Sequence, residues 1–254
     1  TEEDPYAVDW TNTHNATFGP WQLEELEPGV QAVFTPNPNY YRGQPYFSEV
    51  IWREIPVSAN RMALLQGGDV DVALRLTGRE RAQLAGDDSL KIPRVQTNLT
   101  NQWRLNFNVE PFDNKLVRQA MAYSVPYDQI QEQVYFGLAE PMKSFYMPWA
   151  PGYNPDPWVY TEDLEKAQEL LEEAGYPDGF EQEVAVSGGW PEYEELAVQI
   201  KSNLAKIGVT LNIDKMPESK FNENRYERTF PSTIDYDQGQ VPLGAYSYRL
   251  LLSA

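Results

Sequence analysis

The fold is decided by the stretch Asn37-Pro38-Asn39-Tyr40-Tyr41-Arg42-Gly43-Gln44-Pro45 and by the residues that follow it to Ala73. Apolar and polar side chains alternate over residues 50–56, and a period of two is typical of a β-strand. Ser58 can then cap a short helix that ends at Gly67-Gly68, because glycine adopts the left-handed conformation of a helix end without steric penalty. Strand and helix in such close succession predict a mixed α/β unit.

Three further stretches give this segment its context. The segment is preceded by Phe18-Gly19-Pro20-Trp21. A turn and another alternating strand are predicted for Gly68-Asp69-Val70-Asp71-Val72-Ala73. The third stretch, further along the chain, is Pro111-Phe112-Asp113-Asn114-Lys115-Leu116-Val117-Arg118-Gln119-Ala120-Met121-Ala122-Tyr123. In this order, and continued by residues 163–180 and 204–211, the stretches resemble the extracellular solute-binding proteins of ABC importers. The class includes peptide, nickel and oligosaccharide receptors, and the resemblance covers most of the chain.

The resemblance implies a two-lobed α/β fold of the class II periplasmic-binding-protein type, incomplete at both ends of this chain. It implies a binding protein and not an enzyme, with no cofactor and no bound metal. The expected partners are a small-molecule solute, either an oligosaccharide or a peptide, and the permease of an ABC transporter, to which a monomer delivers the solute by hinge closure. The expected location is extracytoplasmic, in the periplasm or at the cell surface, with or without a lipid anchor.

Composition excludes several other classes of protein. The 38 acidic residues outnumber the 20 Lys and Arg and give a formal charge of −18, which opposes nucleic-acid binding because phosphates require a basic patch. An aromatic content of 13% favours a folded chain, and 254 residues allow one or two domains. Cysteine is absent, so that disulfides and thiolate sites are excluded.

Two α/β units are expected, with their boundary near Thr97: residues 1–97 form part of the first lobe and residues 98–254 the second. A polar extended stretch around Thr97 separates two regions that are each periodic by themselves. In the second region Asn114 is expected to cap one helix and Thr161 another, whose acidic side chains lie off its apolar stripe and face solvent.

The same region contains the pattern of a strand, a helix and a strand. Residues 183–187 are typical of a strand, Pro191 suits the first turn of a helix, and apolar residues alternate over residues 209–213 after Gly208. This order and length predict a right-handed βαβ unit.

Catalytic patterns are sparse. His14 is the single histidine, and no Gly-x-Ser-x-Gly elbow supplies a nucleophile to pair with it. The glycine pairs lack the residues of a phosphate loop or a dinucleotide fingerprint. The pairs Asp69/Asp71 and Glu192/Glu195 leave a secreted carbohydrate-active hydrolase as the alternative function. A third candidate function is that of a receptor-like domain that senses a solute and does not deliver it.

The candidate ligand-binding residues combine aromatic faces with polar groups at expected strand ends. Trp190 follows Gly188 and Gly189 where a strand ends and a helix begins, a place where ligands of α/β sheets gather. Resembling proteins place cleft-facing residues at the position of Trp103. In the same proteins, basic and aromatic residues that contact the ligand stand at the positions of Glu218, Arg225 and Tyr226.

The stretch Gly239-Gln240-Val241-Pro242-Leu243 departs from the pattern of resembling peptide receptors. Those receptors carry an aspartate, near the place of Leu243, that neutralises the terminal ammonium of the peptide. Burying an ammonium against leucine is unfavourable, so Gln240 and Leu243 in the site favour an uncharged, ring-containing solute such as an oligosaccharide. An alignment shifted by a few residues would instead give the aspartate's role to Asp235 or Asp237.

Overall fold

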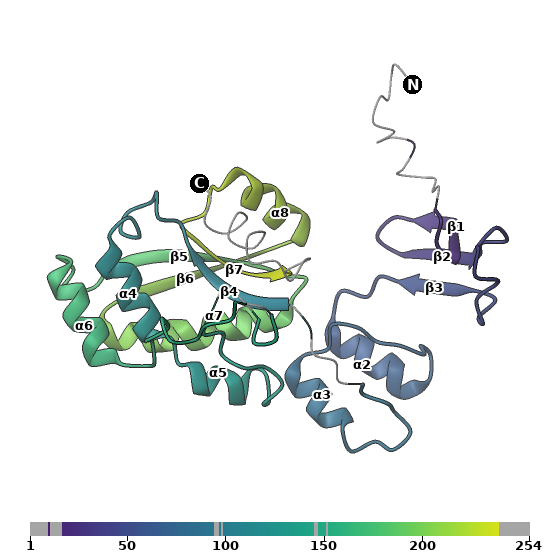
Figure 1. Cartoon of the computed structure of the whole chain (residues 1–254), viewed down its shortest axis with the longest axis horizontal. Helices are drawn as coiled ribbons and strands as arrows, with labels where there is room; N and C mark the ends of the chain where they lie inside the picture. Colours follow the sequence, from purple (N-terminus) through teal and green to yellow (C-terminus); the bar gives the residue numbers. More distant parts are fainter. Residues whose placement is uncertain are drawn as a thin grey trace. The chain divides into compact units, whose positions relative to one another are not determined.

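The computed structural model describes residues 10, 17–93, 97, 99–144, 147–150 and 152–238, except for the side chains of residues 237 and 238. The chain divides into two compact units, Thr1–Asp69 and Val70–Ala254 (Figure 1). Each unit has its own β-sheet, and helices accompany both sheets. The α/β class predicted from the sequence is confirmed.

The smaller unit contains an antiparallel sheet of order β1-β2-β3 and the helix α2. Its strands are β1 (Trp21–Glu27), β2 (Gln31–Pro36) and β3 (Val50–Arg53), and α2 is Ser58–Gly67. Asn37 connects the stretch that it begins to residues 18–21. Its backbone N–H donates to the carbonyl oxygen of Pro20 at 2.8 Å, and its side-chain amide donates to the carbonyl oxygen of Gly19 at 3.0 Å. These bonds fix the entry to β1 against the exit from β2.

Two local expectations for this region are wrong. Ser58 does not cap α2: Val57 holds the cap position and makes no side-chain cap bond, while Gly68 ends the helix at φ +77° as predicted. Residues 70–74 form no strand, and the side chains of Val72 and Leu74 are 72% and 53% exposed. Alternation alone misled here, because none of the described strands pairs with this segment.

The larger unit is built on a four-stranded sheet of order β4-β7-β5-β6. Its strands are β4 (Leu99–Leu105), β5 (Glu181–Ser187), β6 (Thr210–Met216) and β7 (Ser232–Gln238). Strand β5 runs parallel to both β6 and β7, whereas β4 is antiparallel to β7. The β5–β6 pair is connected through α7 (Pro191–Leu204), which confirms the predicted βαβ unit and Pro191 in the first turn of its helix.

Helices cover both faces of this sheet (Figure 1). The helices of the larger unit are α3 (Gly78–Leu84), which lies apart from the sheet in Figure 1, α4 (Lys115–Ser124), α5 (Tyr127–Gln133), α6 (Leu164–Glu173), the short 3-10 helix η1 (Ala205–Ile207) and α8 (Glu218–Glu227), in addition to α7. The main core lies between the sheet and α4 to α7, with Phe112, Met121, Leu171, Tyr193 and Ile234 among its buried members. A second, smaller core of Ala185, Phe221 and Phe230 lies beneath α8.

The ends of the helices agree with the sequence in part. The Asn114 side chain accepts a hydrogen bond from the backbone N–H of Leu116 at 2.9 Å, as predicted for a cap of α4. Helix α6 is capped by Asp163 and not by Thr161, because it is the Asp163 side chain that accepts from the N–H of Lys166. Aspartate and threonine are both favourable caps, and the sequence offered the two within three residues.

The larger unit begins earlier in the chain than Thr97. Residues of α3 belong to it, and a Cβ atom at Gly78 would overlap the backbone oxygen of Val134, so that the two segments lie in close contact. The two compact units therefore meet between Asp69 and Val70, whereas the sequence placed the boundary between the lobes near Thr97. Thr97 as the border between the lobes of the complete protein stays a prediction.

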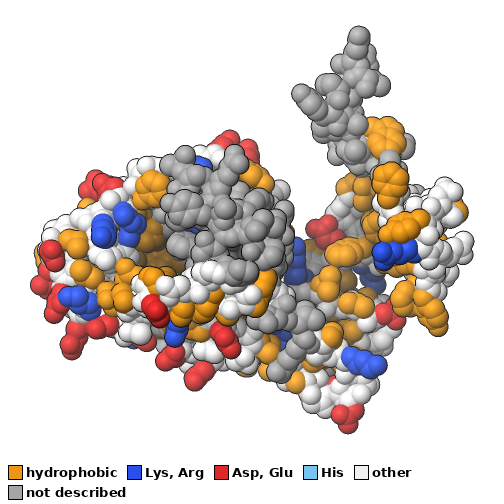
Figure 2. Space-filling model, viewed as in Figure 1, with side chains coloured by type: hydrophobic (Ala, Val, Ile, Leu, Met, Phe, Trp, Pro, Cys, Tyr) orange, Lys and Arg blue, Asp and Glu red, His pale blue; other side chains and the backbone are white. Residues whose placement is uncertain are grey.

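The acidic side chains of α6 face solvent, as predicted. Glu165, Glu169, Glu172 and Glu173 are exposed, whereas Ala167, Leu170 and Leu171 are buried. Figure 2 shows acidic side chains along this edge of the larger unit. Among the described residues, no cluster of three or more acidic or histidine side chains has the arrangement of a metal site, and no helix is long and apolar enough to cross a membrane.

Candidate ligand-binding pocket

A pocket lies where the carboxyl ends of β5 and β7 meet α8 and the start of α7. It contains about 40 Å³ of free space. Its lining combines aromatic and charged side chains: Ser187, Trp190, Tyr193, Glu218, Phe221, Asn222, Arg225, Asp235 and Tyr236. Ligands of open α/β sheets collect at such strand ends, because the loops and helix starts that follow parallel strands converge there.

Three aromatic rings form one wall of the pocket. Trp190 stacks on Tyr193 with ring centres 5.5 Å apart and an interplanar angle of 12°, and it contacts Tyr236 at 4.9 Å. The Nε1 atom of Trp190 and the hydroxyl of Tyr193 are buried without a hydrogen-bond partner among the described residues. Burial raises the pKa of the Tyr193 hydroxyl, which is therefore a protonated donor at neutral pH.

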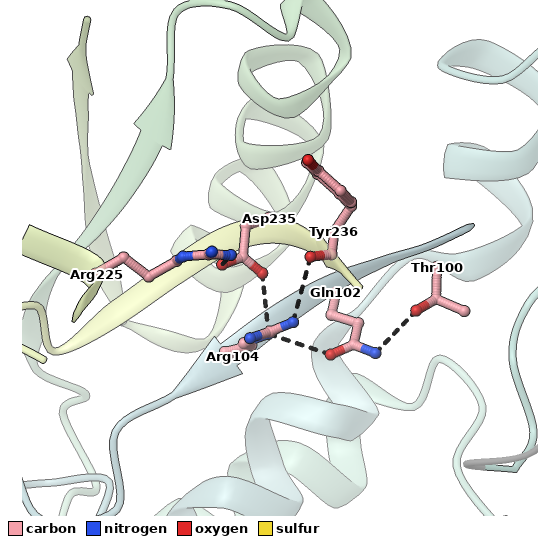
Figure 3. Close-up of polar contacts among 6 residues, drawn as sticks. All are labelled: Thr100, Gln102, Arg104, Arg225, Asp235 and Tyr236. Atoms are coloured by element: carbon pink, nitrogen blue, oxygen red, sulfur yellow. Dashed lines mark hydrogen bonds and ion pairs between the residues drawn. The ribbon is translucent and has the colours of Figure 1, made fainter. Parts of the chain in front are cut away.

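The opposite side carries a buried carboxylate between two guanidinium groups (Figure 3). Asp235 is 2% exposed; its Oδ1 atom lies 2.9 Å from Nε of Arg104, and its Oδ2 atom lies 3.3 Å from Nη1 of Arg225. Burial by itself would lower the pKa of the Arg225 guanidinium, yet the charge of Asp235 raises it above the ordinary value. The Arg225 guanidinium is therefore charged at neutral pH.

Strand β4 holds Arg104 in place through a line of polar contacts on one face. Arg104 donates from Nε to the Gln102 side-chain oxygen at 3.2 Å, and Gln102 donates to the Thr100 hydroxyl at 3.0 Å. Nη2 of Arg104 also donates to the carbonyl oxygen of Tyr236 at 3.4 Å. Figure 3 shows these side chains along the strand. The alternation of a strand places residues 100, 102 and 104 on the same face.

The rim of the pocket carries a second ion pair. The guanidinium of Arg75 lies 3.4 Å from the Glu218 carboxylate and 4.3 Å from the ring centre of Trp190, a cation–π arrangement. Gly189 allows Glu218 this position, because a Cβ atom at residue 189 would lie 2.5 Å from the Glu218 carboxylate. Gly188 ties the adjacent loop to β6 by donating to the Met216 carbonyl oxygen at 2.8 Å.

The predicted site residues thus have different positions. Trp190, Glu218 and Arg225 line the pocket, and Gly188 and Gly189 shape the loop beside it. Trp103 does not line the pocket; it packs against the main core, since its side chain shares a face of β4 with Leu105. Tyr226 is 79% exposed and lies outside the lining. Gln240 and Leu243 lie outside the described residues, as does His14.

Sequence reasoning missed Arg104 and Tyr193, and it named Asp235 only as an alternative to Leu243. Helix α8 itself was not predicted, because residues 217–231 have little apolar periodicity and only Phe221 of the helix is buried. A usable signal was nevertheless present: Thr100, Gln102 and Arg104 are polar at every second position of a strand. Such a polar face indicates contact with polar groups, and Asp235 on the neighbouring strand β7 supplies them.

Comparison with known proteins places the chain in a family. The model of the bacterial extracellular solute-binding proteins, family 5 (middle region), matches residues 1–254. The chain belongs to this family. It is 32% identical to the heme-binding protein A of Haemophilus influenzae over 76% of this chain and 36% of that protein. It is 30% identical to the glutathione-binding protein GsiB of Salmonella typhimurium over 80% of this chain and 40% of that protein.

Two solved binding proteins have the same fold. The binding protein MoaA of A. tumefaciens R10 in complex with mannopinic acid superposes with a TM-score of 0.89 at 25% identity, over 98% of this chain and 50% of that one. A dipeptide-binding protein of Pseudoalteromonas sp. SM9913 in complex with Met-Leu superposes with a TM-score of 0.85 at 24% identity. The match covers 98% of this chain and 51% of that one.

These comparisons confirm three predictions: the family, the periplasmic-binding-protein fold, and a binding protein in place of an enzyme. The chain spans less than half the length of the two curated relatives and about half that of the two solved chains.

Proposed function

We propose that the complete protein binds a small peptide-like solute outside the cytoplasm and delivers it, as a monomer, to the permease of an ABC importer. The observation that carries this proposal is membership of family 5, together with 30% identity to a glutathione-binding protein over 80% of this chain. The pocket at the ends of β5 and β7 is the part of the solute site that this chain contributes. Binding would favour the closed arrangement of two lobes, which the permease recognises.

An oligosaccharide is the second candidate solute. It is favoured by the aromatic lining of the pocket, which a sugar would meet at the ring edges, because Tyr193 and the Arg75 guanidinium cover the two faces of the Trp190 ring. The ammonium argument based on Leu243 lies outside the described residues and stays a prediction. Asp235 is a poor substitute for an ammonium-binding aspartate, since Arg104 and Arg225 already pair with its two oxygens.

Mass spectrometry of the small molecules released from the purified complete protein tests the proposal. We expect a peptide or peptide derivative, whereas a sugar would favour the second candidate. Incubation of the solute with the protein should leave it unchanged; turnover would indicate a hydrolase and contradict the proposal.

Trp190→Ala should weaken binding of the released solute by on the order of 1 to 3 kcal/mol, because it removes aromatic contact area from the pocket lining. Trp158→Ala is a matched control, since Trp158 is an accessible tryptophan of the same unit outside the pocket lining. Equal effects of the two substitutions would count against the pocket as the solute site.

A further inference from the structure

We infer that Arg75 is a specificity-determining residue of this pocket: its guanidinium covers the face of Trp190 that Tyr193 leaves open and withholds that face from flat groups of the solute. The inference rests on the proposed function, because it concerns how the same pocket selects among small solutes. It adds that the pocket discriminates against solutes that bind by aromatic stacking, and that one side chain causes this discrimination.

Both faces of the Trp190 ring are covered by side chains of this protein. The Tyr193 ring stacks on one face, with ring centres 5.5 Å apart and an interplanar angle of 12°. The Arg75 guanidinium lies over the other face, 4.3 Å from the ring centre. A guanidinium is planar and stacks readily on an aromatic face. Arg75 therefore takes the position that a flat ring of a solute would occupy if it stacked on Trp190.

The carboxylate of Glu218 helps to hold the guanidinium over the ring. Nη1 of Arg75 lies 3.4 Å from Oε2 of Glu218. Gly189 makes room for this carboxylate, because a Cβ atom at residue 189 would lie 2.5 Å from it. Trp190 and Glu218 both line the pocket. Arg75 thus connects the start of α7 to α8 at the rim, and a solute that stacks on Trp190 must first displace it.

The backbone around Arg75 fixes where this side chain begins. Arg75 has φ +55°, a left-handed conformation that is uncommon for a residue with a Cβ atom. The next two residues, Leu76 and Thr77, are buried, and Thr77 forms a capping box with Glu80 at the start of α3. The Thr77 hydroxyl accepts from the N–H of Glu80 at 3.2 Å, and the Thr77 N–H donates to the Glu80 carboxylate at 2.8 Å. Conformations of this kind persist where the surrounding structure imposes them, and they occur often at functional sites.

The arginine discriminates between solutes and does not block the pocket. The side chains of Arg75 and Glu218 are 44% and 40% exposed, and an ion pair that is open to water contributes little. A solute can therefore exchange with the guanidinium, at a loss of affinity. This loss applies to a solute that needs the face of Trp190 and not to one that meets only the ring edges.

Equilibrium dialysis of the complete protein against two dipeptide libraries tests the inference. Both libraries have free ends; one carries aromatic side chains and the other aliphatic side chains. Arg75→Ala should raise the ratio of aromatic to aliphatic binding by about three- to tenfold, which is the gain expected from one aromatic contact. A gain of binding cannot come from a variant that fails to fold. An unchanged ratio overturns the inference and leaves the proposed function standing, and a ratio that falls overturns it too, because Arg75 would then bind the solute itself.

Two further variants assign the effect. Glu218→Gln should shift the ratio in the same direction by a smaller factor, because a neutral amide holds the guanidinium less firmly. Arg79→Ala is the control and should leave the ratio unchanged, since Arg79 is an exposed arginine of α3 outside the pocket lining. If neither library binds to the unchanged protein or to any variant, the proposed function is contradicted and the inference falls with it.

Hydroxyl-radical footprinting of the complete protein tests the cover over Trp190 without any solute. Mass spectrometry of the oxidised peptides separates Trp190 from the other tryptophans. In Arg75→Ala the oxidation of Trp190 should rise relative to that of Trp158, which is accessible and lies outside the pocket lining. The same relative oxidation in the variant and the unchanged protein would show that Arg75 does not shield the ring, and this result overturns the inference whatever the solute is.

Discussion

Arg104 pairs with Asp235 across two antiparallel strands, with Nε of the arginine 2.9 Å from a carboxylate that is 2% exposed. Arg225 approaches the other carboxylate oxygen from α8 at 3.3 Å. The buried carboxylate thus pairs with arginines from two different elements. It joins strand β4, strand β7 and helix α8 into one structure behind the pocket.

This arrangement predicts a non-additive loss of stability. Arg104→Met or Arg225→Met alone should cost about 1 to 2 kcal/mol, because the other arginine still pairs with Asp235. The double substitution removes both arginines from a buried carboxylate and should cost more than the sum, about 3 to 5 kcal/mol. Urea denaturation of the four proteins of the cycle measures this coupling.

Lys215→Met is the control for the cycle. Lys215 pairs with Glu194 at 2.6 Å, yet both side chains are nearly half exposed, so that its loss should cost about 0 to 1 kcal/mol. Strict additivity of the two arginine substitutions would show that Asp235 tolerates the loss of both arginines.

A second prediction concerns the loops that enter the parallel strands β5 and β6. A Cβ atom at Gly179 would overlap the backbone carbonyl of Gly208, and Gly179 has φ +77°. Gly175 has a comparable φ of +93° but no atom within 4 Å of its Cβ position. Gly175→Ala should therefore cost about 1 to 2 kcal/mol from backbone strain alone, and Gly179→Ala clearly more. Thermal denaturation compares the two, and similar losses would contradict the close approach of the loops.

A third prediction concerns pH. The Glu192 side chain is buried at the start of α7, and burial raises its pKa above the ordinary 4.5. Glu195 and Glu80 raise it further, whereas the backbone N–H of Glu192 and the guanidinium of Arg81 oppose them. Tyr135 also faces this group; burial is the main reason why its own pKa is raised to about 12, and it is uncharged at neutral pH.

The sign follows from proton binding. Between pH 4.5 and the raised pKa the folded protein holds a proton that the unfolded chain has lost, so that Glu192 lowers stability as pH rises through this window. Each unit of the shift is worth about 1.4 kcal/mol at neutral pH. The change in the free energy of unfolding caused by Glu192→Gln should therefore be more stabilising at pH 7 than at pH 4. Denaturation measured at both pH values tests this.

Glu194→Gln is the matched control on the same helix, because its side chain is exposed. It should change the stability difference between the two pH values by less than about 0.5 kcal/mol. A Glu192→Gln effect that is the same at pH 4 and pH 7 would show that the buried carboxyl is not destabilised by its charge.

The sequence predicted the elements whose signals are local. Asn114 caps a helix, Pro191 begins one and Gly68 ends one, because each acts through its own backbone or its nearest neighbours. The strand expected over residues 70–74 is absent, because a strand needs a pairing partner that alternation does not reveal.

The pocket contains residues that the sequence analysis named on two different grounds. Trp190 was named because it follows a strand end, whereas Glu218 and Arg225 were named only through the resemblance. The Arg104–Asp235–Arg225 group joins residues far apart in the sequence and depends on the order of β4 beside β7. Many acidic residues compete for each arginine in a chain of charge −18, so no spacing singles out this combination.

The last prediction concerns the acidic face of α6. Glu165 and Glu173 each lie four residues from Glu169, and all three are exposed, whereas Lys166 pairs with Glu169 at 2.8 Å. Like charges at this spacing repel by a few tenths of a kcal/mol, and salt screens them within about 10 Å at 0.1 M.

Thermal stability should therefore rise as sodium chloride increases from low to moderate concentration. The double substitution Glu165→Gln and Glu173→Gln should raise the melting temperature at low salt and have little effect at 1 M, where repulsion is already screened. Lys166→Gln should act in the opposite direction at low salt, because it removes the one cation paired with Glu169 on this helix. A melting temperature that falls steadily with added salt would show that attractive charge pairs, and not the repulsion among these carboxylates, dominate the surface.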